Sequence, residues 1–278
     1  MPTVSLPPAV PAHLRADLEA VIGAARIAGE RALAVRASGR WKDEGVLADV
    51  GDQGADGFLQ GFLRGRFPAD AILSEETADT RERLTSARTW IVDPLDGTRE
   101  YSQNRNDWAV HVALVVEHRP VLGVVALPAQ GRVLWGAMHA GQTWGGLIGP
   151  GTVSRGDDPD PEPLRIAVSR SHTPSWMPVF ATEIGGVCVL SGSVGNKVAL
   201  LLLGAADLYA HRRGLKEWDT CAPEIVARAL GWSVSRLGGG ELLYNQTDPR
   251  IDEFLVCRPA RKEHVLTVLR KSGAMGAS

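Results

Sequence analysis

Cysteine is scarce in this chain. The three cysteines, Cys188, Cys221 and Cys257, are far apart, and no two of them have the C-x-x-C spacing. An odd and scattered set excludes a disulfide-stapled scaffold and argues against a zinc site built from thiolates. We therefore expect buried or neutral thiols and a location in the reducing cytoplasm.

Long apolar runs and a strong net charge are also absent. No window approaches the ~18 continuous apolar residues of a membrane span, and residues 1–11 lack the basic and apolar segments of a signal peptide. The formal net charge is -2 for 278 residues. Without a strong global field, the chain is not expected to bind a nucleic acid polymer or a membrane surface. An anionic small molecule would need local partners, such as a metal, a helix end or a few basic side chains.

The apolar pattern divides the chain into two parts of an α/β protein. Residues 1–150 contain two helical patterns, at 16–34 and after Asp52, followed by short strand-like runs separated by turns. This predicts an α+β half with an antiparallel sheet. Residues 151–163 are rich in Gly, Pro and Asp and predict a linker. Strands alternate with helices in residues 164–278, which predicts an α/β half, with the site between the two halves.

The most informative acidic segment reads W-I-V-D-P-L-D-G-T and spans residues 90–98. The proline keeps Asp93 extended, and Gly97 allows the backbone to approach a ligand closely. The carboxylates of Asp93 and Asp96 can then converge on one point. If a helix starts there, the amides of Gly97 and Thr98 are free to bind an anion. Alone, the segment is equally typical of a turn, because Asp-Pro and Asp-Gly are common turn dipeptides.

Two further acidic features change this interpretation. Glu75 and Glu76 follow the preceding strand-like run, and Asp219 stands at an apparent helix start. Taken singly, the glutamates are typical of a solvated edge and Asp219 of an N-cap. Together the carboxylates lie at the ends of strands and helices, where open α/β sheets bind ligands. Such oxygen ligands suit Mg²⁺ shared with a phosphate, and two ions can clamp the oxygens of a phosphoryl transfer.

In this order, the Glu-Glu pair, the Asp-Pro-x-Asp-Gly-Thr box and the Trp-Asp-x-x-Ala-Pro box resemble the signature of the inositol monophosphatase superfamily. The resemblance extends over residues 16–269. It implies a layered α-β-α-β-α sandwich of the fructose bisphosphatase-like kind, often dimeric, with two or three Mg²⁺ ions per active site. The implied ligands of the first ion are Glu75, Asp93 and the carbonyl of Leu95. Those of the second are Asp93, Asp96 and Asp219.

The resemblance also implies roles around the attacking water. Glu75 and Thr98 would activate the water, the amides of Gly97 and Thr98 would bind the phosphate, and Asp52 would orient Thr98. The family usually has Thr three positions before this aspartate, where the present chain has Asp49. This departure concerns the water network and leaves the implied metal ligands in place.

Substrate choice is expected to come from the second half, where three segments resemble the bisphosphate nucleotidases of the CysQ type. The candidate substrate-binding residues are Arg170, Ser171, His172, Ser193, Lys197 and Arg212. His172 can stack on adenine, and the basic side chains can bind a second, uncleaved phosphate. The sequence leaves other interpretations open: His172 as a solvated loop residue, Lys197 as a surface lysine and Arg212 as a solvated corner. His111 alternates with valines and is expected to pack within the sheet.

These features predict a Mg²⁺-dependent phosphatase that converts 3′-phosphoadenosine 5′-phosphate to AMP and phosphate in sulfur assimilation, is inhibited by Li⁺, and has the sulfated nucleotide PAPS as a further candidate substrate. One alternative is a phosphatase of the same fold that acts on inositol 1-phosphate or fructose 1,6-bisphosphate. A remoter alternative is a non-hydrolysing nucleotide sensor, although the implied ligand acids and Thr98 are all present. A dinucleotide-dependent oxidoreductase is disfavoured because G-x-G-x-x-G is missing at a strand–helix turn.

Overall fold

The computed structural model describes residues 6–274. Residues 1–5 and 275–278 lie outside the described part. The first of these ranges belongs to the stretch 1–11 in which no signal peptide is expected, and the second belongs to the predicted second half. The first sheet has the strand order β1-β2-β3-β4-β5-β6, with β1 parallel to β2 and the later neighbours antiparallel. Its strands are β1 (Ala71–Ser74), β2 (Arg88–Asp96), β3 (Ala109–Val116), β4 (Arg119–Leu127), β5 (Arg132–His139) and β6 (Gln142–Ile148).

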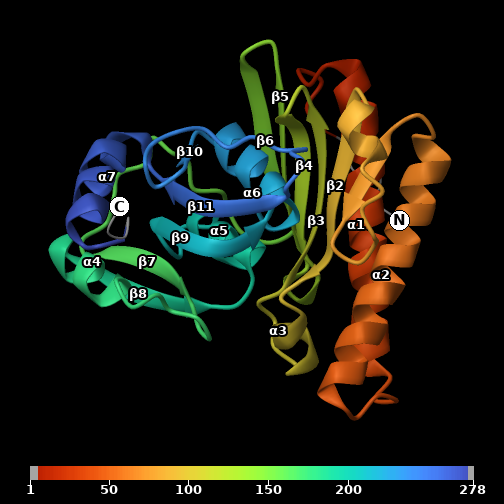
Figure 1. The fold of residues 1–278 in the computed structure, drawn as a ribbon, viewed down its shortest axis with the longest axis horizontal. Coiled ribbons are helices and arrows are strands. Elements are labelled where there is room, and N and C mark those ends of the chain that lie inside the picture. Colours follow the sequence, from red (N-terminus) through yellow and green to blue (C-terminus); the bar gives the residue numbers. More distant parts are fainter. Residues whose placement is uncertain (1–5, 275–278) are drawn as a thin grey trace.

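Two long helices, α1 (Ala12–Ala37) and α2 (Glu44–Arg66), cover the outer face of this sheet (Figure 1). The expectation that the second helix follows Asp52 is wrong, because α2 begins at Glu44. The Asp43 side chain caps that start by accepting a hydrogen bond from the Val46 N–H at 3.0 Å. Asp52 therefore lies inside α2, on its buried side.

The second sheet has the order β10-β11-β9-β7-β8. β8, β7 and β9 run parallel, β11 pairs antiparallel with β9, and β10 pairs antiparallel with β11, so the sheet is mixed. Its strands are β7 (Leu164–Ser169), β8 (Gly186–Ser191), β9 (Leu208–Lys216), β10 (Ser233–Ser235) and β11 (Arg250–Cys257). The short helices α3 (Thr98–Ser102), η1 (Glu82–Thr85), η2 (Pro128–Gln130) and η3 (Pro259–Arg261) lie in connections.

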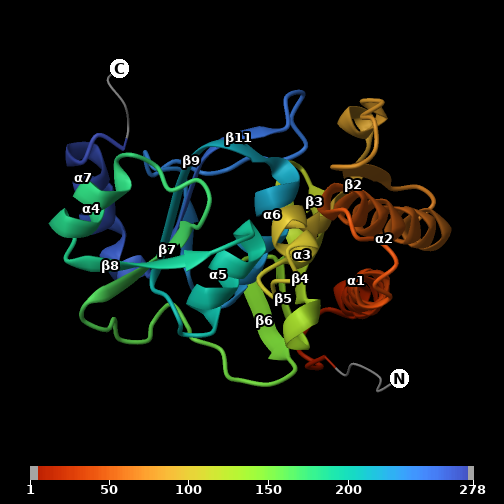
Figure 2. The same cartoon turned by 90° about the horizontal axis from the view of Figure 1, so that it is seen from below.

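Two helices, α5 (Val194–Leu202) and α6 (Glu217–Ala229), separate the sheets, and α4 (Met177–Glu183) and α7 (Lys262–Lys271) cover the far face of the second sheet (Figures 1 and 2). Buried apolar side chains form three clusters: under α1 and α2, between the sheets, and under α4 and α7. The molecule is thus the α-β-α-β-α sandwich that the sequence predicts.

Helix α6 rests on a row of glycines from three neighbouring strands. Gly123, Gly136 and Gly145 pair with one another in register on β4, β5 and β6. A Cβ atom at Gly136 would lie 2.7 Å from the backbone oxygen of Ile225, and one at Gly145 would lie 2.9 Å from the Ala229 Cβ. Side chains at these positions would force the helix away from the sheet, so the glycines allow its close approach.

The segment between the two sheets, residues 149–163, contains neither helix nor strand in the described structure. The division into two halves joined by this linker stays a prediction, because α6 contacts strands of both sheets. Among residues 6–274, no helix combines the length and the apolar character that a membrane crossing requires. The cytoplasmic location and the dimer also stay predictions.

Candidate active site

A β-bulge in β2 brings the first two acids together. Asp93 pairs with His111, and Asp96 pairs with Ala109, so three steps along β2 match two steps along β3. In a regular strand, residues three apart point to opposite faces. The extra residue of the bulge reverses this alternation and places both carboxylates on one side. Asp93 is 1% exposed and Asp96 is 7% exposed.

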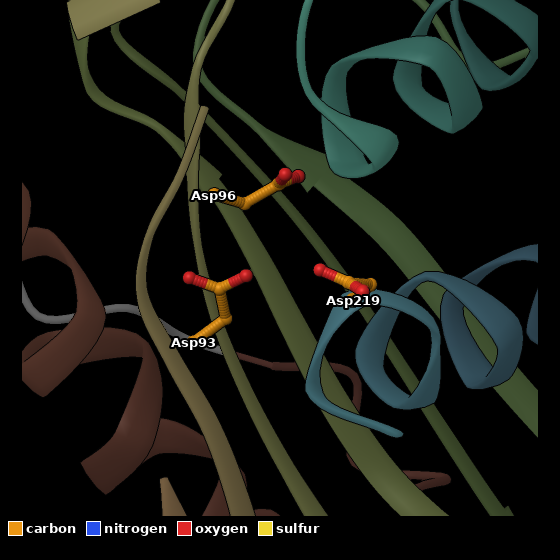
Figure 3. A group of neighbouring side chains, drawn as sticks. All are labelled: Asp93, Asp96 and Asp219. Atoms are coloured by element: carbon orange, nitrogen blue, oxygen red, sulfur yellow. The ribbon is translucent and has the colours of Figure 1, made fainter. Parts of the chain in front are cut away.

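The third acid comes from the start of α6. Asp219 is the third residue of this helix, and its carboxylate accepts a hydrogen bond from the Lys216 N–H at 2.6 Å. It is therefore not the N-cap residue itself, although it does satisfy a backbone group at the helix start. One carboxylate oxygen from each of Asp93, Asp96 and Asp219 lies within 4.8 Å of the other two (Figure 3).

The donor set of this cluster fits a hard divalent cation. Asp93 Oδ2 is buried and has no hydrogen-bond partner among the described residues. Desolvation and the neighbouring charges of Asp96 and Glu75 raise the pKa of Asp93 well above its usual range. Desolvation and Asp96 raise the pKa of Asp219 to about 7. Buried, mutually repelling carboxylates are costly, and a cation bound between them would relieve both effects. Oxygen-only ligands favour Mg²⁺ over zinc or copper.

Asp96 is held by groups from two elements, α5 and β3. Its two oxygens accept hydrogen bonds from the N–H groups of Val194 (3.1 Å) and Gly195 (2.6 Å) at the start of α5. His111 Nε2 lies 3.2 Å from Asp96 Oδ2, and His111 Nδ1 lies 3.1 Å from the Trp218 carbonyl oxygen. Desolvation acts to raise the pKa of Asp96, but His111, the charge of Lys197 and the Gly195 N–H bring it below its usual range.

His111 packs fully buried within β3, which confirms the expectation from its alternation with valines. Desolvation disfavours its charged form, but the carboxylate of Asp96 outweighs this and raises the pKa of His111. The sequence analysis did not connect His111 with the acids. The pairing of β2 with β3 was the available signal, because it places His111 opposite Asp93.

Glu75, after β1, and Asp52, in α2, feel the charges of neighbouring acids, but neither belongs to the group of carboxylates within 4.8 Å of one another among the described residues. Glu75 directly follows β1, and its N–H donates to the Val92 carbonyl at 3.3 Å. The residue is exposed, yet partial desolvation of the carboxylate and the charges of Asp96 and Glu76 raise the pKa of Glu75 to about 7. Asp52 is buried, and Oδ1 has no partner among residues 6–274. Desolvation, Glu76 and Glu75 raise the pKa of Asp52 to about 8.

The candidate phosphate-binding residues, Gly97 and Thr98, directly follow β2. Gly97 has a φ of +95°, in the left-handed region that glycine adopts easily, and α3 begins at Thr98. A Cβ atom at Gly97 would lie 3.0 Å from the Ser193 Cβ. Leu95 is buried, and its N–H donates to Asp93 Oδ1 at 3.1 Å. The turn after β2 thus packs directly against the start of α5.

The start of α5 carries two of the substrate candidates. Ser193 is the N-cap of this helix, and its Oγ accepts from the Asn196 N–H at 2.8 Å. Lys197 is 3% exposed; its Nζ donates to the Gly192 carbonyl and lies 5.3 Å from the centre of the Tyr209 ring. The alternative that Lys197 is a surface lysine is therefore wrong. Desolvation lowers the pKa of Lys197 to about 8, although nearby acids oppose the shift.

Arg170 is already paired with acids of the first half. Its Nη2 lies 2.7 Å from Asp107 Oδ2, and its Nη1 lies 3.6 Å from Glu100 Oε1. Asp107 Oδ2 also accepts the Gly192 N–H at 2.8 Å. Asp107, which the sequence analysis did not single out, therefore connects Arg170 and the turn before α5 to the loop after α3. No local pattern marks this residue, because its partners are far away in the sequence.

The remaining candidates are less closely tied to the cluster. Ser171 and His172 are exposed in the turn after β7, and Ser171 Oγ lies 2.9 Å from His172 Nδ1. Desolvation lowers the pKa of His211, and the nearby His172 contributes to this shift. Arg212 Nη1 donates to the Ala274 carbonyl at 2.8 Å, so this guanidinium contacts the segment that follows α7.

Comparison with known proteins gives the same family as the acidic boxes. Residues 14–274 match the inositol monophosphatase family. The 3′-phosphoadenosine 5′-phosphate phosphatase of Mycobacterium leprae (strain TN) is 38% identical over 272 residues, which cover 94% of this chain and 93% of the relative. The 3′(2′),5′-bisphosphate nucleotidase CysQ of Salmonella typhimurium (strain LT2) is 34% identical over 183 residues, or 66% of this chain and 73% of the relative.

Solved structures agree with this assignment. CysQ from Bacteroides thetaiotaomicron superposes with a TM-score of 0.76 at 26% identity, covering 89% of this chain and 99% of that chain. Inositol monophosphatase-II from Staphylococcus aureus MSSA476 has a TM-score of 0.78 at 17% identity, with 95% and 99% covered, which shows the shared fold. Together with the match over residues 14–274, these findings confirm the predicted family: this chain belongs to the inositol monophosphatase family.

Proposed function

We propose that this chain is a Mg²⁺-dependent phosphatase that hydrolyses 3′-phosphoadenosine 5′-phosphate to AMP and phosphate. The observation that carries the proposal is the 38% identity to the M. leprae 3′-phosphoadenosine 5′-phosphate phosphatase over 93% of that protein's length. The cluster of Asp93, Asp96 and Asp219 supports it, because phosphate-ester hydrolysis of this kind needs a concentrated positive charge beside the phosphate. PAPS is a further proposed substrate, in the context of sulfur assimilation.

The proposed metal ligands are the carboxylates that repel one another when no cation is bound. Glu75, Asp93 and the Leu95 carbonyl are assigned to one Mg²⁺, and Asp93, Asp96 and Asp219 are assigned to a second, with a third ion held more loosely. Bound there, Mg²⁺ neutralises phosphate charge and lowers the pKa of water. The unpartnered Asp93 Oδ2 supports its assignment to both ions.

The chain's own residues supply the proton transfer and the positioning. Glu75, whose pKa is raised to about 7 in the metal-free protein, is proposed as the group that accepts a proton from the attacking water. Thr98 orients this water, and Asp52 positions Thr98. The amides of Gly97 and Thr98 hold the phosphate oxygens. As the water oxygen bonds to phosphorus, the bond from phosphorus to the 3′-oxygen breaks, and that oxygen leaves with a proton from solvent.

Nucleotide recognition is assigned to the second half. His172, exposed in the turn after β7, is proposed to stack on adenine, with the Ser171 hydroxyl beside it. Ser193, Lys197 and Arg170 are proposed to face the uncleaved phosphate. The burial of Lys197 close to Asp96 supports a functional role, because an uncompensated buried ammonium is costly. Arg212 is the weakest member of this set, since its carbonyl partner Ala274 belongs to the segment after α7, whereas that of Lys197 belongs to the turn before α5.

The test is phosphate release with Mg²⁺ from 3′-phosphoadenosine 5′-phosphate, PAPS, inositol 1-phosphate and fructose 1,6-bisphosphate, compared by kcat/KM. We expect the bisphosphate nucleotide to exceed the inositol and fructose esters by at least about a hundredfold, about 3 kcal/mol of transition-state binding. Equal rates, or a preference for inositol phosphate, would reject the nucleotide assignment and retain the phosphatase chemistry. No release from any of the four would favour the nucleotide sensor.

A further inference from the structure

Arg83 is a buried cation outside the carboxylate cluster. It lies in η1, downstream of Glu75, and is 2% exposed. Its guanidinium donates to both carboxylate oxygens of Asp79 at 3.1 and 2.8 Å, to Asn245 Oδ1 at 2.8 Å and to the Gln246 carbonyl at 2.9 Å. In return, Asn245 Nδ2 donates to the Arg83 carbonyl at 2.9 Å. The segment after β1 is thus fixed to a loop of the second half.

The same loop holds the start of α6. The N–H groups of Asn245 and Gln246 donate to the two carboxylate oxygens of Glu217 at 2.6 and 2.8 Å. Glu217 is the first residue of α6 and is 0% exposed, and its own N–H donates to the Pro249 carbonyl at 2.8 Å. The first turn of α6, which carries Asp219, is therefore anchored on both sides by residues 245–249.

These contacts form a continuous chain of buried hydrogen bonds, which we call the Arg83–Asn245–Glu217 latch. It joins two elements from distant parts of the sequence: the segment that follows Glu75, and the first turn of α6 with Asp219. Apolar side chains stabilise an interface at least as well as buried charges do, but they impose less directional geometry. The composition of the latch therefore points to geometric control rather than to stability alone.

We propose that the Arg83–Asn245–Glu217 latch is a positioning device for the metal centre. By fixing the segment after Glu75 against the start of α6, it sets the spacing between Glu75 and Asp219 and thereby the affinity for Mg²⁺. The inference rests on the ligand set assigned under the proposed function. Groups that orient ligands without touching the metal typically account for a 10- to 100-fold range of affinity.

Asn245→Gly is the sharpest test. Asn245 has a φ of +55°, which glycine adopts without strain, so the substitution keeps the backbone and its N–H bond to Glu217 while removing the amide that Arg83 binds. The matched control is Gln246→Ala at the adjacent position. It keeps the backbone bonds of the latch and loses only the side-chain contacts to His118 and Tyr244. Arg83→Lys is a second test variant, because lysine keeps the charge but not the fork of donors.

Three quantities are measured for each protein: the Mg²⁺ dissociation constant by calorimetry on metal-free protein, the Mg²⁺ concentration for half-maximal phosphate release, and the thermal midpoint. We expect Asn245→Gly and Arg83→Lys to weaken Mg²⁺ binding and activation about 10- to 100-fold, with saturating Mg²⁺ restoring most of kcat. Gln246→Ala should stay within about twofold. A lowered thermal midpoint with unchanged Mg²⁺ affinity in Asn245→Gly would overturn the proposal, whether or not Arg83→Lys folds.

Measurements on the wild-type protein distinguish failure of the latch proposal from failure of the proposed function. If wild type neither binds Mg²⁺ nor releases phosphate, the proposed function itself fails. If wild type does both and the two latch variants bind Mg²⁺ as wild type does, only the latch fails.

Discussion

The carboxylate cluster and the turns that carry the proposed substrate-binding residues differ in how firmly the fold holds them. Asp93 and Asp96 are buried on a bulged central strand, and Asp96 accepts two backbone N–H bonds. Ser171 and His172 are exposed in a turn, where their contacts are local. In a family that acts on several phosphate esters, this division keeps the reacting groups fixed while exposed turns change. Substitutions in the buried cluster and in the exposed turns should therefore have different effects.

The largest effect is expected for Asp96→Asn. The amide has nearly the same shape, so the secondary structure should remain, although its NH2 group replaces one of the two oxygens that accept backbone N–H bonds from the start of α5. An amide also binds Mg²⁺ much more weakly than a carboxylate does. We expect kcat/KM to fall by at least about a hundredfold on all the phosphate esters that wild type hydrolyses. Phosphate release measures the loss of activity, and circular dichroism measures whether the fold remains. Wild-type turnover by the variant would contradict the metal assignment.

A smaller and selective effect is expected for His172→Ala. Stacking of an aromatic ring on a base contributes about 1–3 kcal/mol, so turnover of the nucleotide should fall about tenfold. Any activity toward inositol 1-phosphate should be unchanged, because this ester has no base. The exposed His264 on α7 provides the matched control as His264→Ala. Equal losses on both esters would argue against stacking.

Two acids at and beside the proposed metal site should make the stability of the metal-free protein depend on pH. Asp52 has a pKa of about 8 and Asp219 a pKa of about 7, both raised above the unfolded value of about 3.9. Between these limits the folded state binds more protons than the unfolded state. The stability that these groups contribute is therefore complete below about pH 4 and is lost as the pH rises through about 8.

We expect the thermal midpoint of the metal-free protein to fall by about 5 °C between pH 5.5 and pH 8.5 relative to that of Asp52→Asn. Mg²⁺ should raise the wild-type midpoint more at pH 8.5 than at pH 5.5, because protons compete with the cation. Scanning calorimetry with and without a chelator gives both numbers. Parallel pH profiles for wild type and Asp52→Asn would be inconsistent with a raised pKa at Asp52.

The smallest effect is expected for Arg212→Ala. Its guanidinium already donates to the Ala274 carbonyl, so we expect kcat/KM for the nucleotide to change by less than about twofold. Steady-state kinetics decide the matter. A tenfold loss confined to the nucleotide would instead place Arg212 at the uncleaved phosphate.

The sequence predicts those features that depend on neighbouring residues. The buried run before Asp93 and the glycine at position 97 are local signals, and both the strand and the left-handed Gly97 are observed. The expectation that the strand ends at Asp93 is wrong, because β2 continues through a bulge to Asp96 and the chain turns only at Gly97. The start of α2 is mispredicted because Gly45 and Gly51 weaken the helical pattern, although the cap at Asp43 and the spacing of Val46, Leu47 and Val50 are both signals for it.

Contacts between distant segments cannot be predicted from local patterns in the sequence. Arg83 and Asn245 are 162 positions apart, and neither belongs to a periodic pattern. The same holds for Asp107 and its partners Gly192 and Arg170. Such pairs exist only because two loops pack together, and a single sequence contains no local trace of that packing. The chemistry of the site was therefore easier to predict than the groups that hold it in place.

The glycine row beneath α6 determines how far the sensitivity of the active site extends into the molecule. From Asp219 to Ala229 the helix extends roughly 15 Å, at about 1.5 Å per residue. A methyl group at Gly136 would meet the Ile225 carbonyl oxygen at 2.7 Å and displace the helix, and Asp219 moves with it. Substitutions at this row would thus resemble losses of a metal ligand in an activity screen, although the row itself never meets a phosphate. A mutational scan that measures activity alone will not distinguish a displaced α6 from the loss of a metal ligand. Separate measurement of metal affinity is needed to tell them apart.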